Sequence, residues 1–425
     1  MARLGAMTMV ACRDSGPRRL ATQLIGQLKE AKGLDAAGQP TFTASGLDTP
    51  WSLLSQLVAF DSSVPEIERL GIAREAAFDM ARLDAFSLSS YLGCASRLES
   101  EYLSLPKRRF IVLAQLSVSG SDALSGTRRD GMWISFPLEV PTSFVKSRAK
   151  VIDIPAKHHL YADPPSGYRW VRVSVRERCP AAAVAAVESC LQLQLGIWNL
   201  WLNRRKGLSW STGPRQPVNE IGLGPIHTVH QPSGIVDDGV GWYDTGYFAP
   251  FAVKRLGDDA QSIQSFSNRM RGRLGRVAFG GVVENCIRLY NRALDEHDAS
   301  TSYLRMWQTL EAATNTAPNR HADPVRRAAF LYSDHEYVAA ELSHLRDSRN
   351  RLVHTGESSL QVDSNLLRLR LHVERLLMFL AARGAEFPSM EDVGEFLDLP
   401  SSTSELSRKL GLVSKAAQWH GDKPA

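Results

Sequence analysis

Apolar positions in the last third of the chain recur every three or four residues, which is the period of an α-helix. The pattern predicts four consecutive helices, at residues 277–297, 301–314, 323–354 and 364–383. Asp298 is the kind of residue that caps a helix N-terminus, and Pro324 is favoured in a first helical turn. We expect two short amphipathic segments to follow, at 390–397 and 403–413, with Ser389 and Ser402 as their caps.

The chain before this helical block carries different patterns. Residues 15–105 have a helical period in patches, with breaks at 38–40 and at two prolines. The period then changes to two, and it predicts strands at 110–118, 132–140 and 168–178. The expected fold is α+β, with helices and a small antiparallel sheet followed by an all-α four-helix bundle. The predicted divisions are 1–105, helical; 106–255, α+β with a core helix; 256–386, the bundle; and 387–425, a helical extension and tail.

Two segments are apolar enough to be considered as a secretory leader or as a membrane-spanning helix. Residues 1–12 hold only a short apolar run with charges close behind it, so a secretory leader is not expected. Residues 181–202 are long enough to span, but polar residues such as Glu188 and Asn199 interrupt the run and its apolar positions form one helical stripe. We expect a buried core helix and no membrane partner.

The overall composition fits a cytoplasmic protein. The five cysteines are scattered, odd in number and without a Cys-x-x-Cys pair, which indicates a reducing compartment. The net charge of +5 permits an anionic partner without requiring one.

Two basic stretches could contact RNA. In the predicted strand 168–178, Trp170, Arg172 and Arg176 share the face opposite to three valines. Such a face can stack bases and bind phosphates, or it can simply be a solvated strand face. The segment before the bundle is also basic and is either an exposed linker helix or a path for RNA; its arginines include Arg269, Arg271 and Arg273.

The familiar signatures of cofactor and metal chemistry are missing from the sequence. It contains no Walker loop, no His-Glu-x-x-His and no Gly-x-Ser-x-Gly. The pair His227 and His230 falls in a glycine- and proline-rich tract, residues 207–250, without the further ligands that zinc needs. We therefore interpret both histidines as loop residues and predict no metal and no cofactor.

The densest candidate chemistry lies at the end of the third predicted helix, in residues 345–356. Arg349 projects from the middle of an apolar stripe formed by Val338, Leu342, Leu345, Leu352 and Val353. Asn350 and His354, four residues apart, lie together at the edge of that stripe. Gly356 is the expected helix stop, so His354 lies at a helix C-terminus, where the dipole favours positive charge.

An arginine within an apolar stripe needs a partner, because burying an unpaired charge is costly. Glu311 lies in the inward arc of the second predicted helix, near two apolar residues of that arc. We therefore predict that Arg349 and Glu311 form an ion pair.

The Arg349, Asn350 and His354 pattern, within an amphipathic helix that ends in glycine, resembles the HEPN family of helical-bundle ribonucleases, and most closely its Apea-like branch. The family signature is an arginine, a polar residue after it and a histidine four to six residues on. The likeness covers residues 277–385. It implies a metal-independent endoribonuclease with 2′,3′-cyclic phosphate products, acting as a growth-arrest or antiphage effector.

The resemblance also implies roles and partners. His354 would act as acid and base, Arg349 would clamp the phosphate, Asn350 would orient either group, and two copies would form one cleft. RNA and a phage-derived trigger or regulatory partner would be the other partners. Three alternatives stay open: a catalytically silent binding module, a nuclease regulated by the N-terminal half, and a structural role in which Arg349–Glu311 is a buried pair and His354 caps the helix.

Overall fold

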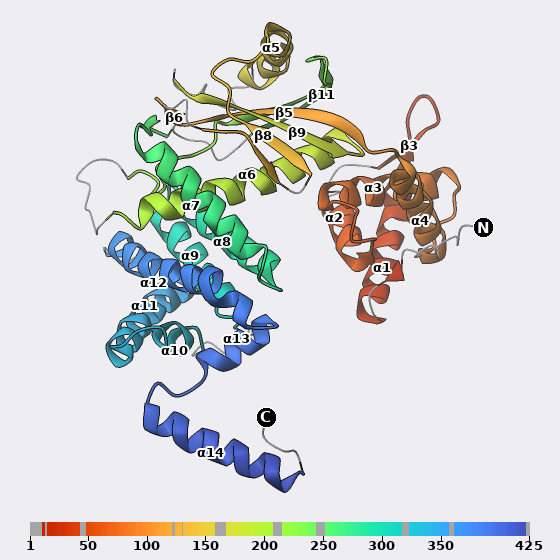
Figure 1. Ribbon diagram of the computed structural model, residues 1–425. Helices are drawn as coiled ribbons and strands as arrows, with labels where there is room; N and C mark the ends of the chain where they lie inside the picture. The colour runs from red at the N-terminus through yellow and green to blue at the C-terminus, as the bar shows by residue number, and fades with distance from the viewer. Residues whose placement is uncertain are drawn as a thin grey trace.

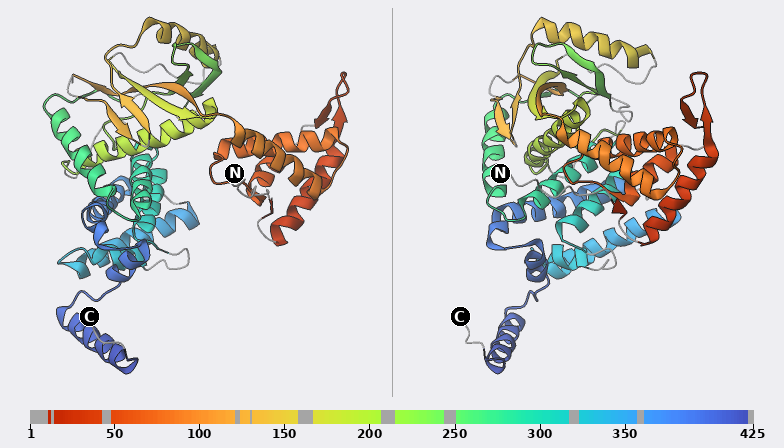
Figure 2. Two further views of the ribbon diagram at one scale, coloured as in Figure 1. Left: turned by 45° about the vertical axis from the view of Figure 1, so that its right-hand side comes forward. Right: turned by 90° about the vertical axis from the view of Figure 1, so that its right-hand side faces the viewer.

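The computed structural model describes residues 11–12, 15–42, 48–120, 124–129, 131–157, 167–206, 215–243, 251–316, 323–356 and 361–421. The fold is α+β, as predicted from the alternation of helical and strand periods. A helical region precedes the main sheet, and a larger helical block follows it (Figures 1 and 2).

The N-terminal region is a small helical unit with its own core. Its helices are α1 (Ser15–Ala31), α2 (Asp48–Leu57), α3 (Glu66–Arg82) and α4 (Leu88–Ser104). Two short ribbons accompany them, β1 (Ala11–Cys12) with β4 (Val58–Ala59) and β2 (Lys32–Leu34) with β3 (Pro40–Phe42). Leu28, Leu54 and Met80 are fully buried where the helices meet, so this region packs mainly on itself.

The main sheet has six antiparallel strands in the order β11-β10-β5-β9-β8-β7. The strands are β5 (Arg108–Leu116), β7 (Thr127–Arg129), β8 (Met132–Ser135), β9 (Arg169–Glu177), β10 (Ile226–His230) and β11 (Val236–Tyr243). β6 (Val118–Ser119) pairs in parallel with β12 (Lys254–Arg255). The predicted strands 110–118 and 168–178 are confirmed as β5 and β9, which pair along their whole length.

Two predictions about this region are wrong. The strand predicted at 132–140 ends at Ser135, and the chain then leads into α5 (Thr142–Lys157), which covers one face of the sheet (Figure 1). The tract 207–250, interpreted as loop, contains β10 and β11, so His227 and His230 are strand residues and both are buried. The pairing of β10 with both β5 and β11 overrode the glycine and proline content of this tract.

Helix α6 (Pro180–Asn203) is the centre of the molecule. Val187, Leu195 and Trp198 pack against the sheet, whereas Leu193 and Ile197 pack into the C-terminal helices. In the described part of the chain it is the one helix whose length and apolar content would suffice to cross a membrane. Most of its side chains are buried between the two layers, which confirms the predicted core helix.

The C-terminal block packs on the other side of α6. Its helices are α7 (Asp259–Leu274), α8 (Gly280–Asp295), α9 (Ala299–Ala313), α10 (Asp323–Ala329), α11 (His335–Thr355) and α12 (Val362–Arg383). Asp298 caps α9 as predicted, since its side chain accepts from the Thr301 amide. The first predicted helix begins only at Gly280, and Val282 on it is exposed rather than inward.

The single helix predicted at 323–354 is wrong, because the chain breaks between α10 and α11. Arg375 of α12 donates two hydrogen bonds, at 2.6 and 3.0 Å, to the carbonyl of Leu331. The Tyr332 hydroxyl lies 2.9 Å from Nδ1 of His372 on the same helix. These contacts from α12 satisfy the Leu331 carbonyl and the Tyr332 hydroxyl within the break, and local helical periodicity could not indicate them.

Two helices follow the block. α13 (Met390–Leu397) begins at the predicted cap, where the Ser389 side chain accepts from the Asp392 amide. α14 (Thr403–Trp419) is longer than the predicted 403–413, and the Ser402 side chain makes no capping hydrogen bond. None of its described residues is buried; its first turns line a cavity together with α10 and α11, and the remainder of the helix extends away from the molecule (Figure 1).

The buried imidazole of His227 is expected to make the fold less stable in acid. Burial, and secondarily the nearby Arg148 cation, lower the pKa of His227 from 6.5 to about 3. Below about pH 6.5 the imidazole of His227 binds a proton in the unfolded chain but stays neutral in the native protein. The free energy of unfolding is therefore highest above that pH and falls as the pH decreases. This group should remove about 2–3 kcal/mol of unfolding free energy between pH 7 and pH 4.5. Urea denaturation at both values measures the loss.

The matched variants are His227→Leu and His344→Leu, which remove a buried and an exposed imidazole, respectively. His227→Leu should make the urea midpoint less sensitive to pH, whereas His344→Leu should keep the wild-type dependence. An equal pH dependence for all three proteins would show that His227 does not set the acid limit.

Candidate functional site

The candidate site is the C-terminal end of α11, which two neighbouring helices fix from its inner side. The Tyr303 hydroxyl of α9 donates to the Leu345 carbonyl at 2.6 Å. Asn365 of α12 donates to the Ser348 hydroxyl at 3.1 Å. Gly356 ends the helix in the left-handed region, with φ of 67°, as the sequence predicted. The last turn of α11 therefore has a defined position and a defined end.

Arg349 reaches the edge of the helical core and keeps part of its side chain in solvent. Its Nη2 lies 3.9 Å from Oε1 of Glu311, so the predicted ion pair is confirmed at the outer limit of such contacts. The same carboxylate oxygen accepts from Nε1 of Trp307 at 2.8 Å. The two side chains are 23% and 26% exposed, so this is a half-buried pair of modest strength rather than a buried structural one.

Asn350 is the second half-buried member of the site. Its Oδ1 accepts a hydrogen bond of 3.1 Å from Nη1 of Arg349. The guanidinium is thus held by an amide on one side and a distant carboxylate on the other. Because neither contact is a bidentate salt bridge, Arg349 retains donors that a phosphate could take.

His354 and Val353 lie on the solvent side of the helix end. Val353 is 49% exposed, so its predicted place in the apolar stripe is wrong. His354 is exposed as well. At 100° per residue it leaves the helix about 140° around the axis from Arg349, but only about 40° from Asn350. Within one chain, Asn350 is thus close to both residues, whereas Arg349 and His354 diverge.

The aromatic and arginine face predicted on β9 is not an open surface. Helix α5 covers it: the Arg148 guanidinium lies 5.4 Å from the Trp170 ring centre, and the Arg172 guanidinium lies 5.4 Å from the Phe144 ring centre. Trp170 belongs to a small core with Val140 and Phe144. Trp170 and Arg172 therefore hold α5 on the sheet, and both side chains are half-buried, so the predicted face is not open; an RNA contact by these two residues stays a prediction. Arg176 is exposed, and its RNA contact stays a prediction.

The arginines of α7 divide into two kinds. Arg269 and Arg273 are exposed. Arg271 is half-buried and donates to the Thr127 hydroxyl at 2.6 Å and to the Gln194 side chain. Burial, with the cation of Arg129 beside it, lowers the pKa of Arg271. Arg271 thus ties α7 to α6 and the sheet, whereas an RNA contact at Arg269 and Arg273 stays a prediction.

A cavity of about 530 Å³ lies on α11 beside the turn that carries Arg349 and Asn350, and the sequence did not indicate it. Its lining residues come from α10, α11, the end of α13 and the start of α14, and Arg346 of α11 is among them. Arg346 precedes Asn350 by one helical turn. In the sequence, only the positive charge of Arg346 pointed to this cavity. The rest of the cavity wall comes from segments that lie tens of residues apart in the chain.

No protein family model, no curated protein and no solved structure matches this chain. Among the described residues, no group of three or more histidine, cysteine, aspartate or glutamate side chains is placed to hold a metal ion. The end of α11 and the cavity beside it hold the chemistry on which a function can be built.

Proposed function

We propose that this protein is a metal-independent endoribonuclease of the HEPN type, acting in the cytoplasm as a growth-arrest or antiphage effector. The observation that carries the proposal is the end of α11, where an incompletely paired arginine, an amide and an exposed histidine occupy one helical turn and a half. This is a set of groups suited to phosphoryl transfer: a cation for the phosphate and a titratable group for protons.

The reaction uses the substrate's own hydroxyl as the nucleophile. His354 removes the proton from a ribose 2′-hydroxyl, and the 2′-oxygen attacks the adjacent phosphorus, to which it is already connected. Arg349 stabilises the negative charge that develops on the phosphoryl oxygens. The bond to the 5′-oxygen breaks, and that oxygen receives its proton from the imidazolium of His354, which thereby returns to its neutral form. The products are a 2′,3′-cyclic phosphate and a free 5′-hydroxyl.

The proposal includes a homodimer. Arg349 and His354 leave the helix about 140° apart, so one chain does not bring the two side chains together face to face. Two copies of α11 related by a twofold axis could supply the groups to one cleft from both sides. The N-terminal helices would then be available to a phage-derived trigger or regulatory partner.

The alternative is a catalytically silent HEPN-like module that binds a partner. The same divergence of Arg349 and His354 favours it, together with the contacts that Arg349 already makes to Glu311 and Asn350. The two proposals differ in whether RNA is cut, so one assay separates them.

The test is incubation of the purified protein with paired RNA and DNA oligonucleotides of one sequence, with and without EDTA. We expect cleavage of the RNA alone, at the same rate in both conditions, because the 2′-hydroxyl is the nucleophile and no metal generates it. End-group analysis should find 2′,3′-cyclic phosphates.

Cleavage of the DNA oligonucleotide would reject this mechanism. Loss of RNA cleavage in the presence of EDTA would reject it as well. If the folded protein does not cut RNA even in the presence of infected-cell extract, the result favours the catalytically silent binding module. If sedimentation shows a monomer under conditions in which RNA is still cut, the shared cleft is wrong, but the reaction mechanism stands.

A further inference from the structure

The cavity beside the candidate site has the size and lining of a ligand site. Its volume of about 530 Å³ lies within the range usual for small-molecule pockets. The apolar part of its wall includes Phe330 and Leu397, from the ends of α10 and α13. Phe330 is half-buried and packs edge-on against Phe396, with ring centres 5.2 Å apart. An aromatic ring fixed in this way can support the flat face of a base.

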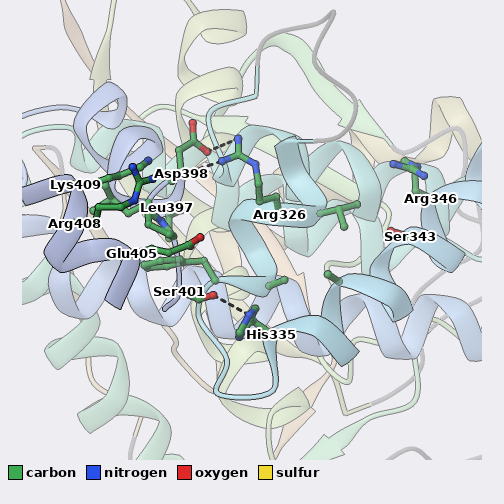
Figure 3. Close-up of a pocket in the computed structure, with 16 residues that line it drawn as sticks. Arg326, His335, Ser343, Arg346, Leu397, Asp398, Ser401, Glu405, Arg408 and Lys409 are labelled. Atoms are coloured by element: carbon green, nitrogen blue, oxygen red, sulfur yellow. Dashed lines mark hydrogen bonds and ion pairs between the residues drawn. The ribbon is translucent and has the colours of Figure 1, made fainter. Parts of the chain in front are cut away.

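The charged part of the wall is predominantly positive. Four fixed cations line the cavity, Arg326, Arg346, Arg408 and Lys409, against the carboxylates of Asp398 and Glu405. Figure 3 shows Arg408 and Lys409 on one side of the cavity and Arg346 on the other. A ligand between them would meet positive charge from both sides, which favours an anion.

Arg326 already has an anionic partner, which it shares with a second arginine. Arg326 Nη2 lies 2.8 Å from Asp398 Oδ1, and Asp398 also receives two bonds of 2.7 Å from the buried Arg327. Arg408 and Lys409, by contrast, are exposed and form no ion pair within the described part of the chain. Among the residues that the structure describes, Arg346 forms an ion pair only with its sequence neighbour Asp347, at 3.3 Å. Three cations therefore remain to bind a ligand.

The cavity and the proposed catalytic residues share one face of α11. Ala339, Ser343 and Arg346 line the cavity, and at helical spacing Asn350 is the next residue of this row. His354 follows one turn later. The rise along the helix is about 6 Å from Arg346 to Asn350 and about 12 Å from Arg346 to His354. A short single-stranded segment could occupy the cavity and reach both residues.

We propose that this cavity binds single-stranded RNA beside the bond to be cleaved, with a base against Phe330 and phosphates on Arg346, Arg408 and Lys409. The assignment rests on the proposed ribonuclease function and specifies how that site would hold its substrate. Arg346, Arg408 and Lys409 are positioning residues, because they contact the flanking phosphates rather than the reacting atoms.

The test separates binding from cleavage by working in the full-length His354→Ala protein. A short fluorescent single-stranded RNA is titrated against this protein and against the same protein carrying Arg346→Ala, Arg408→Ala and Lys409→Ala. Loss of three phosphate contacts should weaken binding tenfold or more and lower the slope of log K against log salt by about 2, since each contact contributes about 0.7. The matched control carries Arg351→Ala, Arg383→Ala and Lys415→Ala, three exposed cations of α11, α12 and α14 that do not line the cavity.

A second measurement addresses the base. Phe330→Leu keeps an apolar wall but removes the stacking surface, so it should weaken binding of the RNA several-fold without changing the salt slope. Circular dichroism melting confirms that each protein is folded before its affinity is compared.

The outcomes distinguish this assignment from the ribonuclease proposal. Equal affinity in the cavity and control variants would overturn the cavity as an RNA site, even if the wild type cuts RNA. Loss of affinity only in the cavity variants would support it, even if the wild type never cuts RNA and the nuclease fails. Displacement of the RNA by an acidic peptide with equal affinity would overturn it in favour of a general polyanion site.

Discussion

Replacement of His354 by alanine is expected to reduce RNA cleavage at least a hundredfold while leaving the melting temperature unchanged. Removing a general acid or base typically costs a factor of about 10²–10⁴ in rate. The side chain is exposed at the end of α11, so the substitution opens no cavity, and its effect on stability should stay within about 0.5 kcal/mol. Initial rates with a fluorogenic RNA and a thermal melt on the same sample measure the two quantities.

The matched control is His344→Ala, which removes an exposed imidazole from the same helix. It should cleave like the wild type. A second comparison uses Arg349→Lys and Arg351→Lys: only the first should lose activity, because an ammonium cannot reproduce the forked geometry of a guanidinium toward phosphate. If His354→Ala and His344→Ala cut RNA equally well, the assignment of His354 is wrong.

The parts of the fold that were predictable are those in which one local signal suffices. The row of apolar residues in α6 specifies a buried helix whatever surrounds it, and the valines at every second position of β9 specify a strand with one buried face. Asp298 and Gly356 mark the ends of α9 and α11 by local hydrogen bonding and backbone geometry. These signals act within a few residues, so tertiary contacts seldom override them.

The errors arose where a distant segment decides the local structure. The break between α10 and α11 is stabilised by Arg375 and His372 of α12, more than thirty-five residues later in the chain. Strand β10 forms because β5 offers its edge, more than a hundred residues earlier. The aromatic and arginine face of β9 looked open because the sequence does not show that α5 folds onto it.

The candidate site was predictable to a similar degree. A charge within an apolar stripe indicated that Arg349 needed Glu311, and the two side chains do lie within ion-pair distance. Val353 was misplaced because the last turn of a helix extends beyond the core that its earlier turns face. The cavity beside Arg346 could not be inferred, since its wall combines α10, α11, α13 and α14.

Replacement of Arg370 by methionine is expected to lower the unfolding free energy by about 3–5 kcal/mol, because it leaves a buried carboxylate without its cation. Arg370 is a residue of α12 whose side chain is 1% exposed and reaches the end of α6, where its Nη1 donates to the Asn203 carbonyl at 2.8 Å. Its Nε is 3.6 Å from Oε1 of Glu374, and that oxygen accepts from the Tyr290 hydroxyl at 2.7 Å. The change therefore breaks a network that joins three helices.

The size of the loss should depend on pH in a direction set by Glu374. Burial raises the pKa of Glu374, and Arg370 opposes this rise. Without the arginine the native carboxyl will hold its proton to a higher pH than the unfolded one does, so Glu374 by itself makes the variant less stable as the pH rises from the unfolded pKa through the native pKa. The deficit relative to wild type should be larger at pH 8 than at pH 5, as read from urea midpoints.

Two further proteins separate the charge from the packing. Arg368→Met removes a half-exposed cation from the same helix and should change stability by less than about 1 kcal/mol. Adding Glu374→Gln to Arg370→Met removes the stranded charge, so the double variant should recover part of the loss and show no greater deficit at pH 8 than at pH 5. If the double variant is instead as unstable as Arg370→Met at both pH values, the lost bond to Asn203 and the lost packing, rather than the buried charge, account for the effect.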